Sequence, residues 1–313
     1  MSTLLIGAGQ MAVDYARVLN ALGVQIDVVG RSEAAVEAFS QTTGLAAQSG
    51  GVEAYLARSR APERAIVAVD VPNLADVTLA LVEAGVQEGL VEKPAGLTLS
   101  SVQAVRDKAR DAQTKVFVGY NRRFYASTAA AREQIARDGG LRAVEFEFTE
   151  WIDRVAASAA SDAAKERWVI ANSSHVIDLA FHLAGAPADW SSRRAGGLDW
   201  HSSGSRFVGS GTTTDDVLFT YVAVWGAPGR WGVTLRTPRR RLRLQPLEQL
   251  FVSEDGVQET EVALPSSEDT DFKPGLYRQV QAFLAGDSRY LCSIEEHAAM
   301  MPVYNEIAGY PDE

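Results

Sequence analysis

The stretch TLLIGAGQMA at residues 3–12 decides the fold of this 313-residue chain. A short apolar run ends at a glycine, and apolar residues then recur at helical spacing over residues 10–22. A G-x-G-x-x-A pattern between a strand and a helix is typical of a dinucleotide-binding loop, in which Gly7 permits the turn and Gly9 lets the backbone approach a pyrophosphate. The free N–H groups of the helix N-terminus would bind the phosphates. We assign cofactor binding to Gly7, Gly9, Gln10 and Met11.

The next hundred residues alternate between apolar strands and longer helical segments. Because strands separated by helices form a parallel sheet with helices on both faces, the pattern predicts an α/β Rossmann domain over residues 1–121. The strands that we expect after the first are 24–29, 65–69, 89–91 and 115–118, and the helices are 33–43, 73–84 and 100–112.

The pattern changes after residue 121. Residues 142–149 alternate strictly between apolar and polar side chains, which is typical of a strand with one wet face. Several strand candidates follow without helices between them, so we predict an α+β domain over residues 122–313 with helices on one face of an open sheet. The further strands expected are 216–225, 230–236, 240–244 and 248–253, and the helices are 124–138, 173–184, 276–285 and 294–308.

Composition excludes several classes of protein. A formal net charge of -10 argues against a generally basic nucleic-acid binder, and the single cysteine, Cys292, rules out an internal disulfide or a cysteine-rich metal cluster. No run approaches the roughly 20 apolar residues that cross a bilayer, and the N-terminus has no basic flank or cleavage-type site. We expect a cytoplasmic protein with no nucleic-acid or membrane partner and no metal.

The tip of the second strand indicates which nicotinamide dinucleotide is bound. Asp27 lies about 20 residues after Gly7, the spacing of the ribose-binding acid in NAD proteins, but it falls in mid-strand. Arg31 and Ser32 occupy the tip instead, and a guanidinium suits a 2′-phosphate that an acid would repel. The sequence therefore favours NADP(H) over NAD(H), although Arg31 can also stack on adenine with either cofactor.

Two further segments carry candidate chemistry. Lys93, in Glu92-Lys93-Pro94, follows a strand near the nucleotide cleft and can polarise a substrate oxygen; the alternative is a surface pair before a turn. His175 can exchange protons near neutral pH, and Asp178 shares its helix face and can orient it; the alternative is a capped amphipathic helix. His182 follows one heptad later, but no ligand cluster accompanies it, so a metal site is not expected.

The segment 150–168 lies between a strand and the helix of His175. It can cover the substrate, and a mobile, solvated loop is an equally good interpretation. From it we select Trp151, Lys165 and Trp168 for substrate contact.

Taken together, these motifs resemble the Gfo/Idh/MocA family, the glucose–fructose oxidoreductase and inositol dehydrogenase group. The order and spacing of the motifs carry the resemblance, which covers essentially the whole chain. The anchors are Gly7–Ala12, the strand 65–69 leading to Val71-Pro72, Glu92-Lys93-Pro94, the segment 119–124 and His175–Leu179.

The resemblance implies a Rossmann domain followed by a domain with a large, mostly antiparallel sheet, whose open face makes a homodimer or homotetramer. It implies that Lys93 is the substrate-binding lysine before a cis Pro94 and that His175 is the acid/base histidine. The resemblance also implies that the substrate contacts Asn121, Arg123, Asn172 and Asp178. It implies further cofactor contacts at Val71, Pro72, Glu92 and Lys93.

The chain departs from the family pattern in two places. Many family dehydrogenases carry an aspartate four residues before the histidine, where this chain has Ala171 with Asn172 beside it. The second departure is at 74–76, where the Pro-x-x-x-His pattern lacks its histidine.

The function that we expect is hydride transfer between NADP(H) and a sugar, sugar-nucleotide or cyclitol carbonyl or secondary alcohol. The lost aspartate keeps open a reductase of a C=N bond or another unsaturated metabolite on the same fold. A non-catalytic nucleotide-binding regulator is the third alternative, because folds outlive functions.

Overall fold

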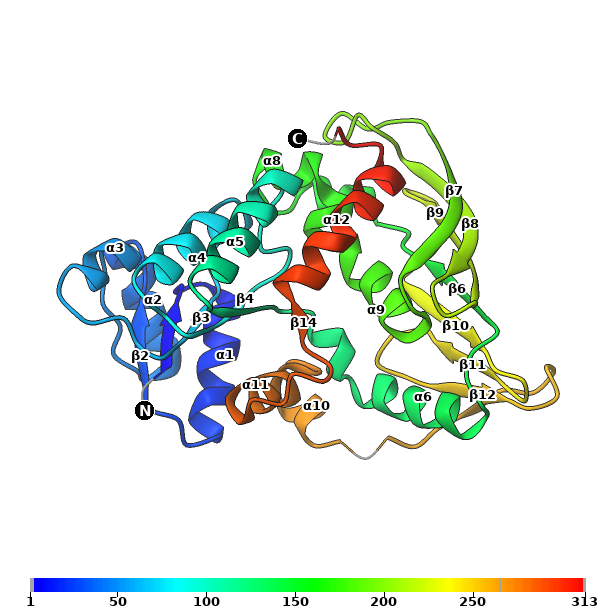
Figure 1. Ribbon diagram of the computed structural model, residues 1–313, viewed down its shortest axis with the longest axis horizontal. Helices are drawn as coiled ribbons and strands as arrows, with labels where there is room; N and C mark the ends of the chain where they lie inside the picture. Colours follow the sequence, from blue (N-terminus) through cyan, green and yellow to red (C-terminus); the bar gives the residue numbers. More distant parts are fainter. Residues whose placement is uncertain (1–2, 265, 312–313) are drawn as a thin grey trace. The chain divides into compact units, whose positions relative to one another are not determined.

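The computed structural model describes residues 3–264 and 266–311, in which the backbone forms two compact units (Figure 1). Of the described residues, the first unit contains 3–120 together with Thr270–Ala299. The second contains 121–264, 266–269 and 300–311. Among the described helices, none combines the length and the apolar character that a membrane span requires.

The first unit is built on a six-stranded sheet with the order β14-β5-β4-β3-β1-β2. The five strands from the N-terminal segment are parallel to one another, and β14 pairs with β5 in antiparallel fashion. The strands are β1 (Thr3–Ile6), β2 (Ile26–Val29), β3 (Arg64–Val67), β4 (Glu88–Val91), β5 (Lys115–Val118) and β14 (Cys292–Ser293).

Helices connect the parallel strands, and local sequence sets their ends. Ser32 begins α2 by accepting the N–H of Ala35, and Gly44 ends it in the left-handed conformation that glycine adopts without a Cβ clash. Thr98 and Ser101 form a capping box at the start of α5. The helices are α1 (Gln10–Ala21), α2 (Glu33–Thr43), α3 (Gly51–Leu56), α4 (Leu74–Glu83), α5 (Leu99–Asp111) and α11 (Leu276–Ala285), with a 3₁₀ turn, η1 (Val71–Asn73), before α4.

The second unit is built on an eight-stranded sheet with the order β13-β12-β11-β10-β6-β9-β8-β7. All neighbours are antiparallel except β6 and β9. The strands are β6 (Ala143–Glu147), β7 (Pro187–Ala195), β8 (Arg206–Thr213), β9 (Leu218–Val224), β10 (Gly232–Arg236), β11 (Arg241–Leu244), β12 (Phe251–Ser253) and β13 (Thr260–Glu261).

One face of this sheet is covered and the other is open. Helix α9 packs against β6 and β10, and α6 packs against β11 (Figure 1). On the covered face, Phe146 stacks on Tyr221 at 5.4 Å and meets Phe181 of α9 at 5.5 Å between ring centroids. The remaining helices are η2 (Asn121–Phe124), α6 (Ala126–Arg137), α7 (Ile152–Ala156), α8 (Asp162–Glu166), the π-helical turn η3 (Val169–Ser173), α9 (Ser174–Ala184), α10 (Glu268–Asp271) and α12 (Ile294–Ala308).

The fold class is confirmed: a Rossmann domain precedes a domain with a large, mostly antiparallel sheet. The expected division into residues 1–121 and 122–313 differs from the observed units, because Thr270–Ala299 packs with the first unit. The strand of this segment, β14, is only two residues long, and α11 packs on α1, so the association is not visible in local sequence. The expected elements also omitted the helices α3, α7, α8 and α10 and the strands β7, β8, β13 and β14.

Candidate functional site

The loop after β1 forms the floor of a cleft in the first unit. Gly7 has φ +128, and a Cβ there would overlap the carbonyl oxygen of Ala68 at the end of β3. Only glycine fits this approach, because it has no Cβ and tolerates positive φ. Gly9 is the N-cap of α1, and no atom lies within 4 Å of the position that its Cβ would take. The backbone N–H groups of this helix N-terminus are therefore accessible to an anion.

The cleft has a volume of about 410 Å³ and is lined by the ends of three strands. Gly7 and Gly9 lie on one side, and Arg31 and Ser32 line it at the tip of β2. Ser32 also caps α2, which fixes its hydroxyl at this position. The shape and the exposed backbone donors fit the pyrophosphate and ribose of a dinucleotide.

The end of β2 bears on the choice of cofactor. The Arg31 side chain is 80% exposed and its guanidinium lies 3.7 Å from the Asp70 carboxylate, which is 70% exposed. A surface pair of this kind contributes little to stability, so Arg31 is available to a ligand. Asp27 lies within β2. Burial raises the pKa of Tyr55, and the negative charge of Asp27 raises it further. Asp27 does not line the cleft among the described residues.

Other predicted cofactor residues lie around this cleft but are not among the described residues that line it. Gln10 and Met11 begin α1, and Gln10 bonds to Asp14 at 3.1 Å. Val71 and Pro72 form the 3₁₀ turn η1.

Glu92 and Lys93 follow β4, and the Lys93–Pro94 peptide is cis, as the resemblance implied. Two contacts hold this turn. The Tyr15 hydroxyl donates to Glu92 Oε1 at 2.7 Å, and His297 Nε2 lies 2.6 Å from the Pro94 carbonyl oxygen. Because that carbonyl only accepts, the His297 nitrogen donates. Burial and the Glu92 charge raise the pKa of Tyr15 well above its usual value, which keeps it a hydrogen-bond donor.

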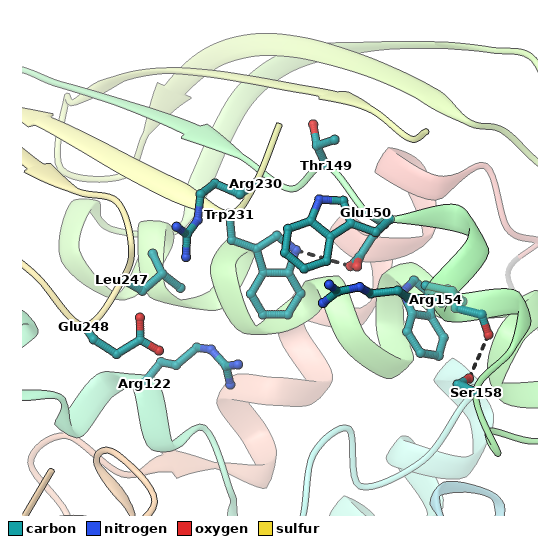
Figure 2. Close-up of a pocket in the computed structure, with 12 residues that line it drawn as sticks. Arg122, Thr149, Glu150, Arg154, Ser158, Arg230, Trp231, Leu247 and Glu248 are labelled. Atoms are coloured by element: carbon teal, nitrogen blue, oxygen red, sulfur yellow. Dashed lines mark hydrogen bonds between the residues drawn. The ribbon is translucent and has the colours of Figure 1, made fainter. Parts of the chain in front are cut away.

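A second hollow, here called the indole pocket, lies wholly within the second unit (Figure 2). Its volume is about 330 Å³, within the range of small-molecule sites. Its lining combines three tryptophans, Trp151, Trp168 and Trp231, with three arginines, Arg122, Arg154 and Arg230, and two carboxylates, Glu150 and Glu248.

The arginines of the indole pocket lie against aromatic rings. Arg122 is 5.0 Å from the ring centroid of Trp231, and Arg154 is 4.2 Å from that of Trp151. Figure 2 shows Arg122 and Arg230 on one side of the Trp231 ring and Arg154 on the other. Within the described part of the chain, none of these three arginines forms an ion pair with a carboxylate. The pocket therefore presents cationic groups that a ligand can use.

Glu150 is the buried acid of this pocket, with 7% of its surface exposed. Its Oε1 accepts from Ser173 Oγ at 2.7 Å, from Asn172 Nδ2 at 3.2 Å and from Trp231 Nε1 at 3.2 Å. Burial raises the pKa of the Glu150 carboxyl, and the hydrogen bonds of these three side chains oppose that rise.

His175 lies in the first turn of α9 and is 6% exposed. Its ring centroid is 6.2 Å from that of Trp231. The serines before it do not cap the helix with their side chains: Ser173 bonds to Glu150, and Ser174 Oγ donates to the Ile170 carbonyl at 2.7 Å. The cap that the sequence suggested is absent at Ser173 because the π-helical turn η3 continues directly into α9.

Two predicted substrate residues, Arg123 and Asp178, pair with each other. They form a two-point ion pair, with distances of 2.8 and 2.6 Å, and each is 3% exposed. Neither lines the indole pocket, and their assignment to the substrate stays a prediction. Burial, with the charges of Arg123 and Arg132, holds the pKa of His182 well below its usual value and keeps that ring neutral.

The remaining predicted substrate residues differ in whether they line the indole pocket. Trp151 and Trp168 line the indole pocket, and Asn172 reaches it through Glu150. Lys165 turns away and donates to the Ala156 carbonyl at 2.9 Å. Asn121 is buried in η2, at 4% exposure.

The sequence reasoning missed Glu150, Arg154, Arg230 and Trp231 as site residues. The alternation of side chains along β6 could have identified Glu150. Counting in steps of two from the buried Phe146 and Phe148 leads to residue 150, so its side chain is expected on the covered face.

Comparison with known proteins places the chain in a class. Residues 1–120 match the GFO_IDH_MocA model, described as "Oxidoreductase family, NAD-binding Rossmann fold". This match shows that residues 1–120 carry the NAD-binding Rossmann fold of that oxidoreductase family, in agreement with the resemblance seen in the motifs. The Rossmann domain of the chain binds a pyridine nucleotide. A search of curated proteins found no match.

Solved structures with the same fold cover nearly the whole chain. UDP-N-acetylglucosamine 3-dehydrogenase GnnA from Acidithiobacillus ferrooxidans is 16% identical with a TM-score of 0.78, covering 100% of this chain and 98% of its own. A putative NADPH-dependent oxidoreductase from Desulfitobacterium hafniense is 16% identical, with a TM-score of 0.80 and coverage of 98% and 94%. Levoglucosan dehydrogenase in complex with NADH is 14% identical, with a TM-score of 0.79 and coverage of 99% and 96%.

The two glycines of the loop make separable predictions. Gly7→Ala introduces a Cβ that overlaps the Ala68 carbonyl, so we expect the free energy of unfolding to fall by about 1–3 kcal/mol. Gly9→Ala meets open space and leaves stability unchanged, but its methyl group enters the phosphate region and weakens dinucleotide binding about tenfold or more. Chemical denaturation and calorimetric titration check the pair. Equal stability of both variants would contradict the assigned role of Gly7.

Proposed function

We propose that the chain transfers hydride between NADP(H) and a sugar, sugar-nucleotide or cyclitol, at a carbonyl or secondary alcohol. The observation that carries the proposal is the glycine-floored cleft whose rim bears Arg31 and Ser32. The cofactor supplies the hydride donor or acceptor when bound. The residues of the chain bind it, orient the substrate and manage the hydroxyl proton.

Arg31 favours NADP(H) because its exposed guanidinium can form two charge-assisted hydrogen bonds to a 2′-phosphate. The Ser32 hydroxyl beside it adds a donor. Asp70 lies 3.7 Å from Arg31 and can accept from a ribose hydroxyl, so the same rim tolerates NAD(H) less tightly.

The indole pocket supports a substrate with both a ring and a negative charge. Indole faces pack against the apolar face of a sugar ring, and arginines bind phosphate or carboxylate groups. This combination favours the sugar-nucleotide member of the three substrate classes. The structural neighbour described as a UDP-N-acetylglucosamine dehydrogenase is consistent with that choice.

We assign the proton chemistry to Lys93 and His175. In the oxidation direction, the substrate C–H bond breaks with its electron pair as hydride, and His175 takes the hydroxyl proton. The Lys93 ammonium stabilises the negative charge that develops on the oxygen. In reduction the same two groups act in reverse.

The open face of the second sheet supports a homodimer or homotetramer. Val208, Leu218 and Val222 are 52%, 61% and 46% exposed, although they lie in regular strands. Such a row of apolar side chains marks an interaction surface.

A cofactor titration tests the assignment of Arg31. We expect Arg31→Ala to weaken NADPH binding about 10- to 100-fold, since a charge-assisted hydrogen bond contributes about 1.5–3 kcal/mol. NADH affinity changes little. Arg17→Ala, an exposed arginine on α1, is the matched control and alters neither. Parallel loss for both cofactors, or preference for NADH in the wild-type chain, would overturn the assignment.

Single-turnover hydride transfer tests the two catalytic groups. Lys93→Ala and His175→Ala should each slow the step about 10²- to 10⁴-fold, the range for a lost acid/base or electrostatic group. Lys165→Ala is the control, because that lysine is bonded to a backbone carbonyl outside the pocket. Cofactor affinity is unchanged in all three variants. Rates within twofold of wild type for both active-site variants would refute the roles.

Light scattering tests the open face. Val222→Arg places a charge in the apolar row and should shift the assembly toward a monomer. Val257→Arg is the control, since Val257 is 82% exposed outside the strands. A monomeric wild-type chain would contradict the assembly proposal.

A further inference from the structure

Glu150 occupies a position where the strand pattern places an apolar residue. The alternation that buries Phe146 and Phe148 on the covered face continues to residue 150, just past the end of β6. A carboxylate at 7% exposure there loses most of its hydration. Within the described part of the chain no ion pair compensates it.

The partners of Glu150 are neutral hydrogen-bond donors. Ser173, Asn172 and Trp231 donate to Oε1 at 2.7, 3.2 and 3.2 Å, and Asn172 also reaches Oε2 at 3.4 Å. In these bonds the Glu150 carboxyl only accepts, which favours its ionised form. Burial acts in the opposite direction and raises the pKa of the carboxyl. A buried acid balanced between these two effects, and lining a hollow, is a functional-site candidate.

The hydrogen bonds of Glu150 converge on the surroundings of His175. Asn172 and Ser173 end the π-helical turn that leads into α9, and His175 is the second residue of that helix. Trp231, the residue before β10, lies next to both Glu150 and His175. Its indole N–H donates to Glu150, and its ring centroid lies 6.2 Å from that of His175. Figure 2 draws the Trp231–Glu150 hydrogen bond as a dashed line.

Residues 167–177 contain no acidic side chain of their own. Glu150, which follows β6, brings a carboxylate to within 3.2 Å of the Asn172 side-chain nitrogen.

We propose that Glu150 is the carboxylate of the substrate pocket: it positions Trp231 and the 172–173 turn beside His175, and its Oε2 accepts a hydrogen bond from a substrate hydroxyl. This rests on the proposed function of the site. Glu150 is a positioning and substrate-binding residue, and the hydroxyl proton goes to His175.

Four further charged side chains line the same pocket: Arg154 from α7, Arg122 from η2, Arg230 before β10, and Glu248. A measured pH dependence is therefore assigned to Glu150 only by comparison with a variant that lacks its charge.

Steady-state kinetics on the holoenzyme test the proposal. We expect Glu150→Gln to lower kcat about 10- to 100-fold, to raise KM for substrate, and to remove the acidic limb of the kcat/KM pH profile. Glu150→Asp recovers part of the rate because it restores the charge. The matched control Glu147→Gln, at the last residue of β6 and outside the indole pocket, behaves as wild type. Glu150→Gln activity within twofold of wild type, with an unchanged pH profile, overturns the proposal.

A readout without substrate separates this proposal from the proposed function. The raised pKa means that the folded state binds the Glu150 proton more tightly than the unfolded state. Stability contributed by the protonated form is therefore lost as pH rises from the ordinary glutamate range through the folded pKa. We expect Trp fluorescence and denaturation midpoints to show this decline in wild type and in Glu147→Gln but not in Glu150→Gln. Identical profiles for all three would refute the buried carboxylate, whether or not a substrate has been turned over.

Discussion

The first unit depends on the approach of the Gly7 backbone to the carbonyl of Ala68. The pairing of β1 with β3 brings the two loops together, and the Ala68 N–H donates to Ile6 at 2.7 Å. A side chain at Gly7 would push these strand ends apart. This contact places the Gly7–Gly9 loop at the floor of the cleft, and the pairing of β1 with β2 brings Arg31 to its rim.

The second unit contains buried charged side chains next to an aromatic pocket. Arg123 and Asp178 neutralise each other and stabilise the packing of η2 on α9. Glu150 instead has neutral donors, and the pocket arginines lie against indole rings rather than carboxylates. The paired charges therefore serve the fold, and the unpaired ones remain available to a ligand.

Sequence reasoning identified what local pattern encodes. The glycine loop, the helix ends and the strand series of the first 120 residues were visible because periodicity and capping are local. Strands β7 and β8 were missed because their sequences, PADWSSRRA and RFVGSGTT, are rich in Ser, Gly and Arg and lack a sustained apolar alternation. Glu150 was missed as a site residue because it resembles Glu145 and Glu147, although its parity places it on the covered face. Only tertiary contacts show that Lys165 turns away and that Trp231 lines the pocket.

The account rests on a pyridine nucleotide bound in the Gly7 cleft, and calorimetric titration of the wild-type chain tests this most directly. We predict one site per chain, with NADPH bound more tightly than NADH because of Arg31. Absence of binding by both nucleotides to a folded chain would contradict the account.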